Sequence, residues 1–285
     1  MKPPIVELNS VFKSFDQHSV LRDLNWRIEP GSVIGLLGRN GAGKSTLLEC
    51  LLGLRGIDRG SNLLFGESAQ HLSSATQENI GYVPQQSDLF EWFTTQQMLS
   101  YFQSFYPRWN QAKVEQLISR WDIPTNRLIS KLSAGQKQRL SIIRALAHQP
   151  ALLVLDEPVA SLDPSGRRDF LRELITDVIE RETTVIFSTH ILSDLERIAM
   201  EIAFLNDGRI KLQEPLDNLL ENTVRIIGDT ASLPTFAKEL SRKQISAQQS
   251  SLLVQLTASE LAQAQHNALN IDAIGLEDLF IELTA

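Results

Sequence analysis

One eight-residue segment limits what this chain can fold into. It reads Gly38-Arg39-Asn40-Gly41-Ala42-Gly43-Lys44-Ser45, and it stands between a short apolar run at 32–37 and leucines at helical spacing that begin at Leu47. A glycine-rich turn between a strand and a helix lets consecutive backbone N–H groups wrap a phosphate chain, and the helix adds its positive N-terminal end. The pattern predicts a P-loop for a nucleoside triphosphate.

Two side chains of this loop have specific expected roles. Lys44 is expected to neutralise the β- and γ-phosphates, and the Ser45 hydroxyl to be a ligand of Mg²⁺. The alternative is a glycine-rich turn that precedes a helix by chance. A lysine followed by a hydroxyl at this offset after a strand argues against that alternative.

A second apolar run, at 151–155, ends in the carboxylates Asp156 and Glu157. A carboxylate at the carboxyl edge of a parallel strand lies close to the P-loop in such sheets. We therefore expect Asp156 to hold Mg²⁺, directly or through water, and Glu157 to accept a proton from the attacking water as a general base. The alternative is a pair of solvated acids, which the P-loop in the same chain disfavours.

The rest of the chain divides by its hydrophobic pattern. Apolar and polar side chains alternate over 5–28, as in half-buried antiparallel strands, and 88–144 is mostly helical in pattern. Apolar runs at 184–187 and 202–205 indicate further buried parallel strands, and Asp207-Gly208-Arg209 is a hairpin turn signal.

From about residue 222 the pattern changes to short strand and helix candidates. These candidates lie at 224–227, 233–240, 252–256, 258–268 and 276–283. The sequence thus predicts a large domain over 1–220 and a small α+β accessory domain over 221–285.

Composition excludes some classes of protein. Lys and Arg number 27 against 34 Asp and Glu, a net charge of −7, which disfavours a general nucleic-acid binder. Cys50 is the single cysteine, so no disulfide forms within the chain, and a reducing cytosol is the expected setting. The N-terminus lacks the apolar core of a secretion signal, and no run approaches the roughly 18 apolar residues of a spanning helix. If the protein serves a membrane, another chain is expected to span it.

Residues 5–218 resemble the ATP-binding cassette (ABC) proteins. The most discriminating piece is Leu132-Ser133-Ala134-Gly135-Gln136, which resembles the family's signature sequence with alanine where glycine is commoner. The resemblance implies that this loop caps a helix and binds the γ-phosphate held by an opposite subunit, through the Ser133 hydroxyl and the Gly135 N–H. Ala134 is compatible with this role if its backbone is in a conformation open to non-glycine residues.

Four further positions complete the resemblance. Gln85, in Tyr82-Val83-Pro84-Gln85, resembles the glutamine that approaches the metal and water and senses a membrane partner. Ser161-Leu162-Asp163 resembles the loop that crosses between subunits, with departures at Val159 and Ser161. His190 resembles the switch histidine on the γ-phosphate, and Phe15 the aromatic residue that stacks on adenine. A role in the core is the alternative for both; their order and context favour the site, more strongly for His190.

The resemblance implies an α/β P-loop nucleotide-binding cassette. It has a RecA-like core, an antiparallel β subdomain, a helical subdomain at about 88–144 and the small C-terminal α+β domain. The implied catalytic residues are Glu157, His190 and Gln85, and the implied metal ligands are Ser45, Gln85 and Asp156. The implied nucleotide-binding residues are Phe15, Gly38, Arg39, Asn40, Gly41, Ala42, Gly43, Lys44, Ser45, Thr46, Ser133, Gly135 and Gln136.

The implied activity is hydrolysis of ATP, with Mg²⁺, between two copies of the chain. Each chain carries both halves of the site, so a homodimer would hold two composite sites. The implied further partner is an integral membrane permease, which would place the chain on the cytoplasmic side of the cell membrane. No nucleic-acid partner is expected.

Aromatic residues between Tyr82 and Trp121 bear on the permease. Met98, Phe102 and Phe105 are at helical spacing and are expected in the core of the helical subdomain. Phe90, Trp92 and Phe93 do not follow that spacing, and we interpret them as lining a groove for a short helix of a membrane subunit.

The segment 276–283 places its apolar residues on one helical face and resembles the ending of bacterial exporter cassettes with separate permeases. It favours export over import. Two other classes stay open: a soluble, non-transport cassette ATPase such as an assembly, regulatory or translation factor, and a nucleic-acid repair ATPase. The single P-loop disfavours translation-type members, which carry two cassettes, and no zinc module or long coiled coil of the repair type is present.

Overall fold

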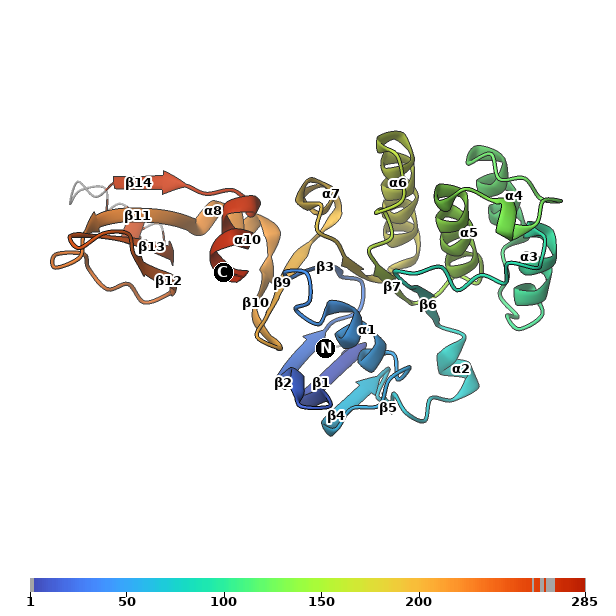
Figure 1. Cartoon of the computed structure of the whole chain (residues 1–285), viewed down its shortest axis with the longest axis horizontal. Helices are drawn as coiled ribbons and strands as arrows, with labels where there is room; N and C mark the ends of the chain where they lie inside the picture. Colours follow the sequence, from blue (N-terminus) through green and yellow to red (C-terminus); the bar gives the residue numbers. More distant parts are fainter. Residues whose placement is uncertain (1–2, 258, 262–263, 265–269, 285) are drawn as a thin grey trace.

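Among the residues that the structure describes, the strands form three sheets, of four, six and four strands. The computed structural model describes residues 3–257, 259–261, 264 and 270–284 of the 285-residue chain. In Figure 1 the first sheet lies at the bottom, the six-stranded sheet crosses the middle, and the third sheet lies at the left. No helix among these residues has the length and apolar character needed to span a membrane.

The first sheet is antiparallel, as the alternation over 5–28 predicted. Its order is β2-β1-β4-β5. One face of β1 and β2 is buried and the other is solvated, which explains the period of two. The bounds are β1 Val6–Phe15, β2 His18–Ile28, β4 Arg59–Leu64 and β5 Glu67–Ser68.

The six-stranded sheet has the order β10-β9-β3-β8-β7-β6. Every pair is parallel except the β9–β10 hairpin, which turns at Asp207 and Gly208, both at positive φ as a tight hairpin requires. The four apolar runs expected as strands, at 32–37, 151–155, 184–187 and 202–205, are confirmed as β3, β7, β8 and β9. The bounds are β3 Val33–Leu37, β6 Ile80–Val83, β7 Leu152–Asp156, β8 Thr184–Ser188, β9 Glu201–Asn206 and β10 Arg209–Pro215.

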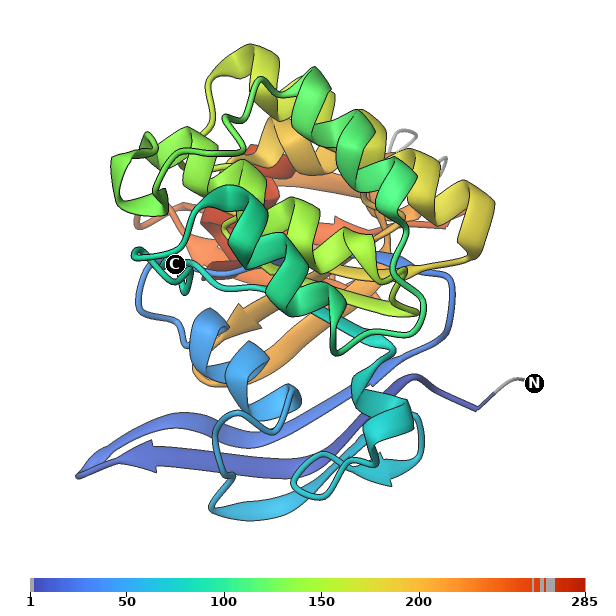
Figure 2. The ribbon, with the colours of Figure 1, turned by 90° about the vertical axis from the view of Figure 1, so that its right-hand side faces the viewer.

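Helices cover both faces of this sheet, so β3, β7 and β8 are buried along their whole length. Helix α1 (Lys44–Leu51) packs between the antiparallel sheet and the six-stranded sheet, and Figure 2 shows it in that position. The opposite face carries α5 (Ala134–Ala147), α6 (Pro164–Arg181) and α7 (Leu192–Ile198).

The predicted helical segment is confirmed and lies at the right of Figure 1. It contains α3 (Thr95–Gln103), α4 (Gln111–Arg120) and the first part of α5, with the 3-10 turn η1 (Ile129–Lys131) between the last two. A capping box opens α3, between Thr94 and Gln97. A shorter helix, α2 (Ser74–Gln77), precedes β6.

Met98 is buried and Phe102 is partly buried, as their spacing predicted. The prediction for Phe105 is wrong: this side chain is 56% exposed. Helix α3 ends at Gln103, so the helical spacing no longer applies two residues later.

The C-terminal sheet is antiparallel with the order β12-β13-β11-β14. The candidates at 224–227, 252–256 and 276–283 are confirmed as parts of β11, β13 and α10. The bounds are α8 Leu216–Asn222, β11 Thr223–Asp229, β12 Glu239–Gln244, β13 Gln249–Gln255, β14 Asn270–Ala273 and α10 Leu276–Thr284.

Two details of this region differ from expectation. The candidate at 233–240 is mostly irregular, because Pro234 lacks an N–H and Leu233 folds back onto the core formed by Ile226, Leu252 and neighbouring residues. Strand β14 was not anticipated. The candidate at 258–268 lies largely outside the described residues.

Helix α10 joins this region to the rest of the molecule. Leu276 and Leu279 belong to the main core, and the Asn206 side chain donates to the Leu283 carbonyl oxygen at 3.1 Å. The sheet itself has a small core of its own. The division of the chain at residue 220 stays a prediction.

Candidate active site

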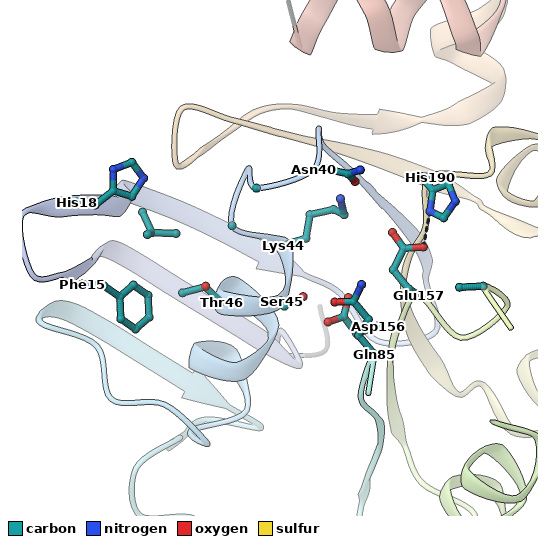
Figure 3. Close-up of a pocket in the computed structure, with 14 residues that line it drawn as sticks. Phe15, His18, Asn40, Lys44, Ser45, Thr46, Gln85, Asp156, Glu157 and His190 are labelled. Carbon is teal, nitrogen blue, oxygen red and sulfur yellow. Dashed lines mark hydrogen bonds and ion pairs between the residues drawn. The ribbon is translucent and has the colours of Figure 1, made fainter. Parts of the chain in front are cut away.

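A cavity of about 510 Å³ lies beside the loop that joins β3 to α1. Figure 3 shows its lining residues, which come from β1, β2, α1 and the ends of β6, β7 and β8. The predicted site residues that line it are Phe15, Asn40, Gly41, Gly43, Lys44, Ser45, Thr46, Gln85, Asp156, Glu157 and His190. His18, Val20 and Ala160 also line it, although the sequence did not predict them as site residues.

The loop has the backbone that its glycines make possible. Gly41 and Gly43 have φ values of 82° and 98°, in the left-handed region that side chains rarely adopt. A Cβ atom on Gly43 would also lie 2.7 Å from Cγ1 of Val20. The loop therefore closes against β2 only with glycine at this position. Gly38, Arg39 and Ala42 belong to the loop but are not among the residues that line the cavity.

Lys44 places its ammonium group at the centre of the loop. Nζ donates to the Gly38 carbonyl oxygen at 2.8 Å. Burial lowers the pKa of Lys44, while the carboxylates of Glu157 and Asp156 act in the opposite direction. A nearly buried cation among backbone N–H groups is suited to an anionic ligand.

The two carboxylates follow each other at the end of β7. Oδ1 of Asp156 accepts a hydrogen bond from Oγ of Ser188 at 2.6 Å. The Glu157 N–H donates to Oγ of Ser188 at 2.9 Å, and Glu157 has a φ of 50°. Ser188 was not among the site residues predicted from the sequence. The available signal was a hydroxyl at the end of an otherwise apolar run.

His190 lies next to Glu157. Its Nδ1 is 2.8 Å from Oε2 of Glu157, the contact drawn as a dashed line in Figure 3. Sheet order explains the pairing, because β8 lies between the P-loop strand β3 and the carboxylate strand β7. Residues that follow β8 therefore lie beside those that follow β7.

The other end of the cavity is formed by the tip of the β1–β2 hairpin. Phe15 is opposite His18 in the strand register, and Val20 follows on β2. Cations lie over the Phe15 ring, with Arg55 Cζ at 5.0 Å and Lys13 Nζ at 5.6 Å from its centroid. An aromatic ring held in place by such cation contacts can stack on a flat base.

Three oxygen-bearing side chains fit a magnesium ion. Ser45, Gln85 and Asp156 line the same cavity, and Figure 3 shows them close together beside Lys44. Hydroxyl, amide and carboxylate oxygens are hard ligands of the kind Mg²⁺ prefers. The residues present therefore fit the expected ion.

The predicted signature residues lie elsewhere. Ser133 caps α5: its Oγ accepts from the Gln136 N–H at 3.2 Å, and Gln136 Oε1 accepts from the Ser133 N–H at 3.1 Å. Ala134 is the first residue of a right-handed helix, so its position does not require glycine. Ser133, Gly135 and Gln136 are not among the residues that line the cavity.

Comparison with known proteins agrees with this geometry. The sequence profile of the ABC transporter family matches residues 21–160. The ABC transporter ATP-binding protein YtrB of Bacillus subtilis is 34% identical over 223 residues, 78% of this chain and 76% of that protein. The chain belongs to the ABC transporter ATP-binding proteins. The family prediction is thus confirmed.

Other ABC relatives cover different shares of the chain. The Nod factor export ATP-binding protein I of Rhizobium etli is 34% identical over 210 residues, 72% of this chain and 66% of that protein. The uncharacterized ABC transporter ATP-binding protein YdbJ of Bacillus subtilis is 27% identical and covers 100% of this chain and 96% of its own length.

Solved structures confirm the cassette fold. One described as an ATP binding subunit of an ABC transporter has a TM-score of 0.68 at 26% identity, covering 76% of this chain and 92% of that one. The ATP-binding cassette MJ0796, solved as a dimer bound to ADP and Pi, has a TM-score of 0.67 at 24% identity, covering 74% of this chain and 98% of its own. As a member of the ABC family, this chain is an ATPase.

Proposed function

We propose that this ATP-binding subunit of an ABC transporter closes into an ATP-bound homodimer and drives a separate integral membrane permease. One observation in particular supports the proposed dimer. The cavity contains the phosphate loop, both carboxylates and His190, whereas Ser133 and Gly135 do not line it. A second copy of the chain would supply those two residues, and each copy would complete the site of the other.

Different residues of the chain have different roles in the site. The loop N–H groups and Lys44 bind the phosphates. Ser45, Gln85 and Asp156 would hold Mg²⁺, which when bound neutralises charge on the phosphates. Glu157 accepts the proton of the attacking water, and the hydrogen bond from His190 holds its carboxylate in place.

Signature contacts across the dimer would depend on the γ-phosphate. The Ser133 oxygen already accepts the Gln136 N–H, so its own proton is left to donate to an anion. Loss of the γ-phosphate removes this bridge and lets the two copies separate. Opening and closing is then the mechanical output.

The dimer is tested by Glu157→Gln, which keeps the shape of the side chain and removes the base. We expect this variant to bind ATP, hydrolyse it very slowly and elute as a dimer on size-exclusion chromatography with ATP. Lys44→Ala is the matched control, which should lose most ATP affinity and stay monomeric. A strictly monomeric ATP-loaded Glu157→Gln at high concentration would refute the proposal.

A cluster of aromatic side chains, in which Trp92 and Tyr101 are exposed and Phe90 and Phe93 are partly buried, supports the permease contact. Phe90, Trp92, Phe93 and Tyr101 form what we name the aromatic patch. Trp92 is 71% exposed and stacks on Phe90 at 5.4 Å, and Phe93 and Tyr101 line a surface hollow of about 680 Å³. Exposed aromatic groups beside a groove are typical of protein-docking sites.

A chain of contacts leads from this patch toward Gln85. Phe90 stacks on Phe102 at 6.2 Å, and the Arg144 guanidinium lies 5.0 Å from the Phe102 ring. Arg144 in turn bonds to the Tyr82 carbonyl oxygen and the Asp88 carboxylate, which flank Gln85 in the chain. A partner seated on the patch would therefore act on the Gln85 segment.

The permease contact is tested by replacing Trp92 and Phe93 with alanine. We expect this variant to keep soluble ATP hydrolysis and to lose co-purification with membranes solubilised in detergent. Undiminished association would contradict the role of the patch. Recovery of the unaltered chain only in complexes with cytosolic proteins would favour the alternative, a non-transport cassette ATPase.

Export is the proposed direction, at the cytoplasmic face of the cell membrane. It is supported by the resemblance of 276–283 to exporter endings and by the likeness to the Nod factor export proteins. The sulfate/thiosulfate import protein CysA of Synechocystis is also similar, at 33% over 240 residues. Transport assays in inside-out vesicles decide between the two, because only an exporter loads such vesicles on addition of ATP.

A further inference from the structure

We propose that Ser188 is a positioning residue, which fixes Asp156 and Glu157 relative to each other and thereby sets how strongly the chain binds Mg²⁺. This inference rests on the roles proposed above for the two carboxylates. Ser188 itself does not line the cavity. It therefore acts through its neighbours.

Strand pairing places Ser188 beside the carboxylates. It is the last residue of β8, and its register partner is Asp156, the last residue of β7. Its side chain is 0% exposed, so the hydroxyl is not bonded to bulk water. Its two contacts, to Asp156 Oδ1 at 2.6 Å and to the Glu157 nitrogen at 2.9 Å, use its one donor and one of its two acceptor lone pairs.

The direction of each hydrogen bond follows from the chemistry of the groups. A backbone N–H can only donate, so Oγ of Ser188 accepts from Glu157. The hydroxyl proton is then free to point at Oδ1 of Asp156. One oxygen of Asp156 is thus committed to Ser188, and the lone pairs of Oδ2 are left for a metal ion or its water. Ser188 sets the rotation of the carboxylate.

Glu157 is held at two points by the same strand end. Its backbone is in the left-handed region, with φ 50°, and its N–H donates to both Oγ and the carbonyl oxygen of Ser188. Its carboxylate is bonded at 2.8 Å to His190, two residues after Ser188. The unusual backbone turn that aims Glu157 into the cavity is therefore stabilised by the Ser188 hydroxyl.

A purely structural role predicts a different outcome from a positioning role. If Ser188 only satisfied buried polar groups, its removal would lower the melting temperature and leave the Mg²⁺ requirement unchanged. If it orients Asp156, its removal weakens Mg²⁺ binding, because partners of metal ligands commonly change metal affinity about 10–100-fold. Mg²⁺ dependence separates the two roles.

The experiment compares Ser188→Ala with Ser188→Thr, which keeps the hydroxyl on a β-branched side chain. The full-length chain is titrated with Mg²⁺ at a fixed concentration of a fluorescent ATP analogue, and binding is repeated in EDTA. We expect Ser188→Ala to raise the half-saturating Mg²⁺ concentration about 10–100-fold, with little change of binding in EDTA. Ser188→Thr should stay close to the unaltered chain.

Ser141→Ala is the matched control for loss of a buried hydroxyl. Ser141 is 2% exposed on α5, and within the described part of the chain its Oγ has no hydrogen-bond partner. This variant should titrate like the unaltered chain. If Ser188→Ala does not fold, Ser188→Cys takes its place, since a thiol of similar size is a weaker donor.

An unchanged Mg²⁺ titration in a folded Ser188→Ala or Ser188→Cys variant overturns the inference, even if the melting temperature falls. Asp156→Asn distinguishes this result from failure of the underlying assignment. If Asp156→Asn also leaves the Mg²⁺ titration unchanged, the proposed role of Asp156 is wrong. If Asp156→Asn shifts it and Ser188→Ala does not, only the role of Ser188 is wrong.

Discussion

Nδ1 of His190 and Oε2 of Glu157 are 2.8 Å apart, across the ends of the adjacent strands β8 and β7. An ionised carboxylate can only accept, so Nδ1 carries the proton of this hydrogen bond. Glu157 is 7% exposed at its side chain and His190 is 56% exposed. The histidine therefore covers the carboxylate from the solvent side and leaves its own Nε2 for another partner.

His190→Ala is expected to reduce kcat for ATP hydrolysis about 10–100-fold, the equivalent of the 1.5–3 kcal/mol of a hydrogen bond to a charged group. Phosphate release at saturating ATP measures this change. ATP binding should be retained, because Lys44 and the loop are unaltered. His71→Ala, at an exposed position, is the control. An unchanged kcat would show that Glu157 does not depend on His190.

Arg144→Met is expected to lower the free energy of unfolding by about 1–3 kcal/mol, because the Tyr82 carbonyl oxygen loses its bond to the guanidinium. The Arg144→Lys variant should lose less stability, because lysine keeps the positive charge although it lacks the planar guanidinium group. Urea denaturation measures both. Arg172→Met removes an exposed arginine whose ion pair spans 3.8 Å, and should change stability by less than about 0.5 kcal/mol. Equal losses at the two positions would contradict a special role for Arg144.

His148 predicts a loss of stability in mild acid. Burial lowers the pKa of His148, and its backbone hydrogen bonds raise it by a smaller amount. The positive charges of Arg108 and Arg144 lower it further. Its folded pKa thus lies below the unfolded value of 6.5, and the unfolded chain binds more protons between the two values. The contribution of neutral His148 to stability is complete above about pH 6.5 and is lost as the pH falls from there toward the folded pKa.

The measurement is the free energy of unfolding from about pH 7.5 to about pH 5.5. His148→Phe keeps a ring to stack on Tyr106, which lies 4.1 Å from His148, and removes the titrating group. The loss of stability in acid should be smaller in this variant than in the unaltered chain. Identical pH profiles would contradict the prediction.

Cys50 is expected to be unreactive in the folded chain. It is buried in α1, and burial raises the pKa of its thiol to about 11. Because the thiolate is the reactive form, a thiol reagent at about pH 8 should modify the native chain about 10²-fold more slowly than the chain in urea. Absorbance of the released chromophore measures this, and Cys50→Ser gives the background. Equally fast modification of both states would show that the helix opens readily.

Most of the fold was predictable because local patterns specify it. The glycines at Gly41 and Gly43 specify a backbone that few other residues adopt, and the run that ends at Asp156 has the length and composition of a buried strand. Prediction failed where the residue pattern continues beyond the end of its helix, or where contacts with distant residues decide the local structure. Phe105 continues a helical spacing beyond the end of its helix, and Leu233 belongs to a turn that only the C-terminal core explains.

The sequence alone determined which chemical groups this protein carries: a glycine-rich loop with Lys44, the carboxylates Asp156 and Glu157 after a strand, and Ser133 at the start of a helix. Each of these groups could be predicted because its pattern depends only on residues a few positions away in the sequence. Only the tertiary structure decided that Ser188 contacts Asp156, that His190 contacts Glu157, and that His18 and Val20 line the same cavity. The order of strands in the sheet, β3-β8-β7, is not their order in the chain. Contacts between such distant residues arise from packing of the whole sheet, so no short pattern encodes them.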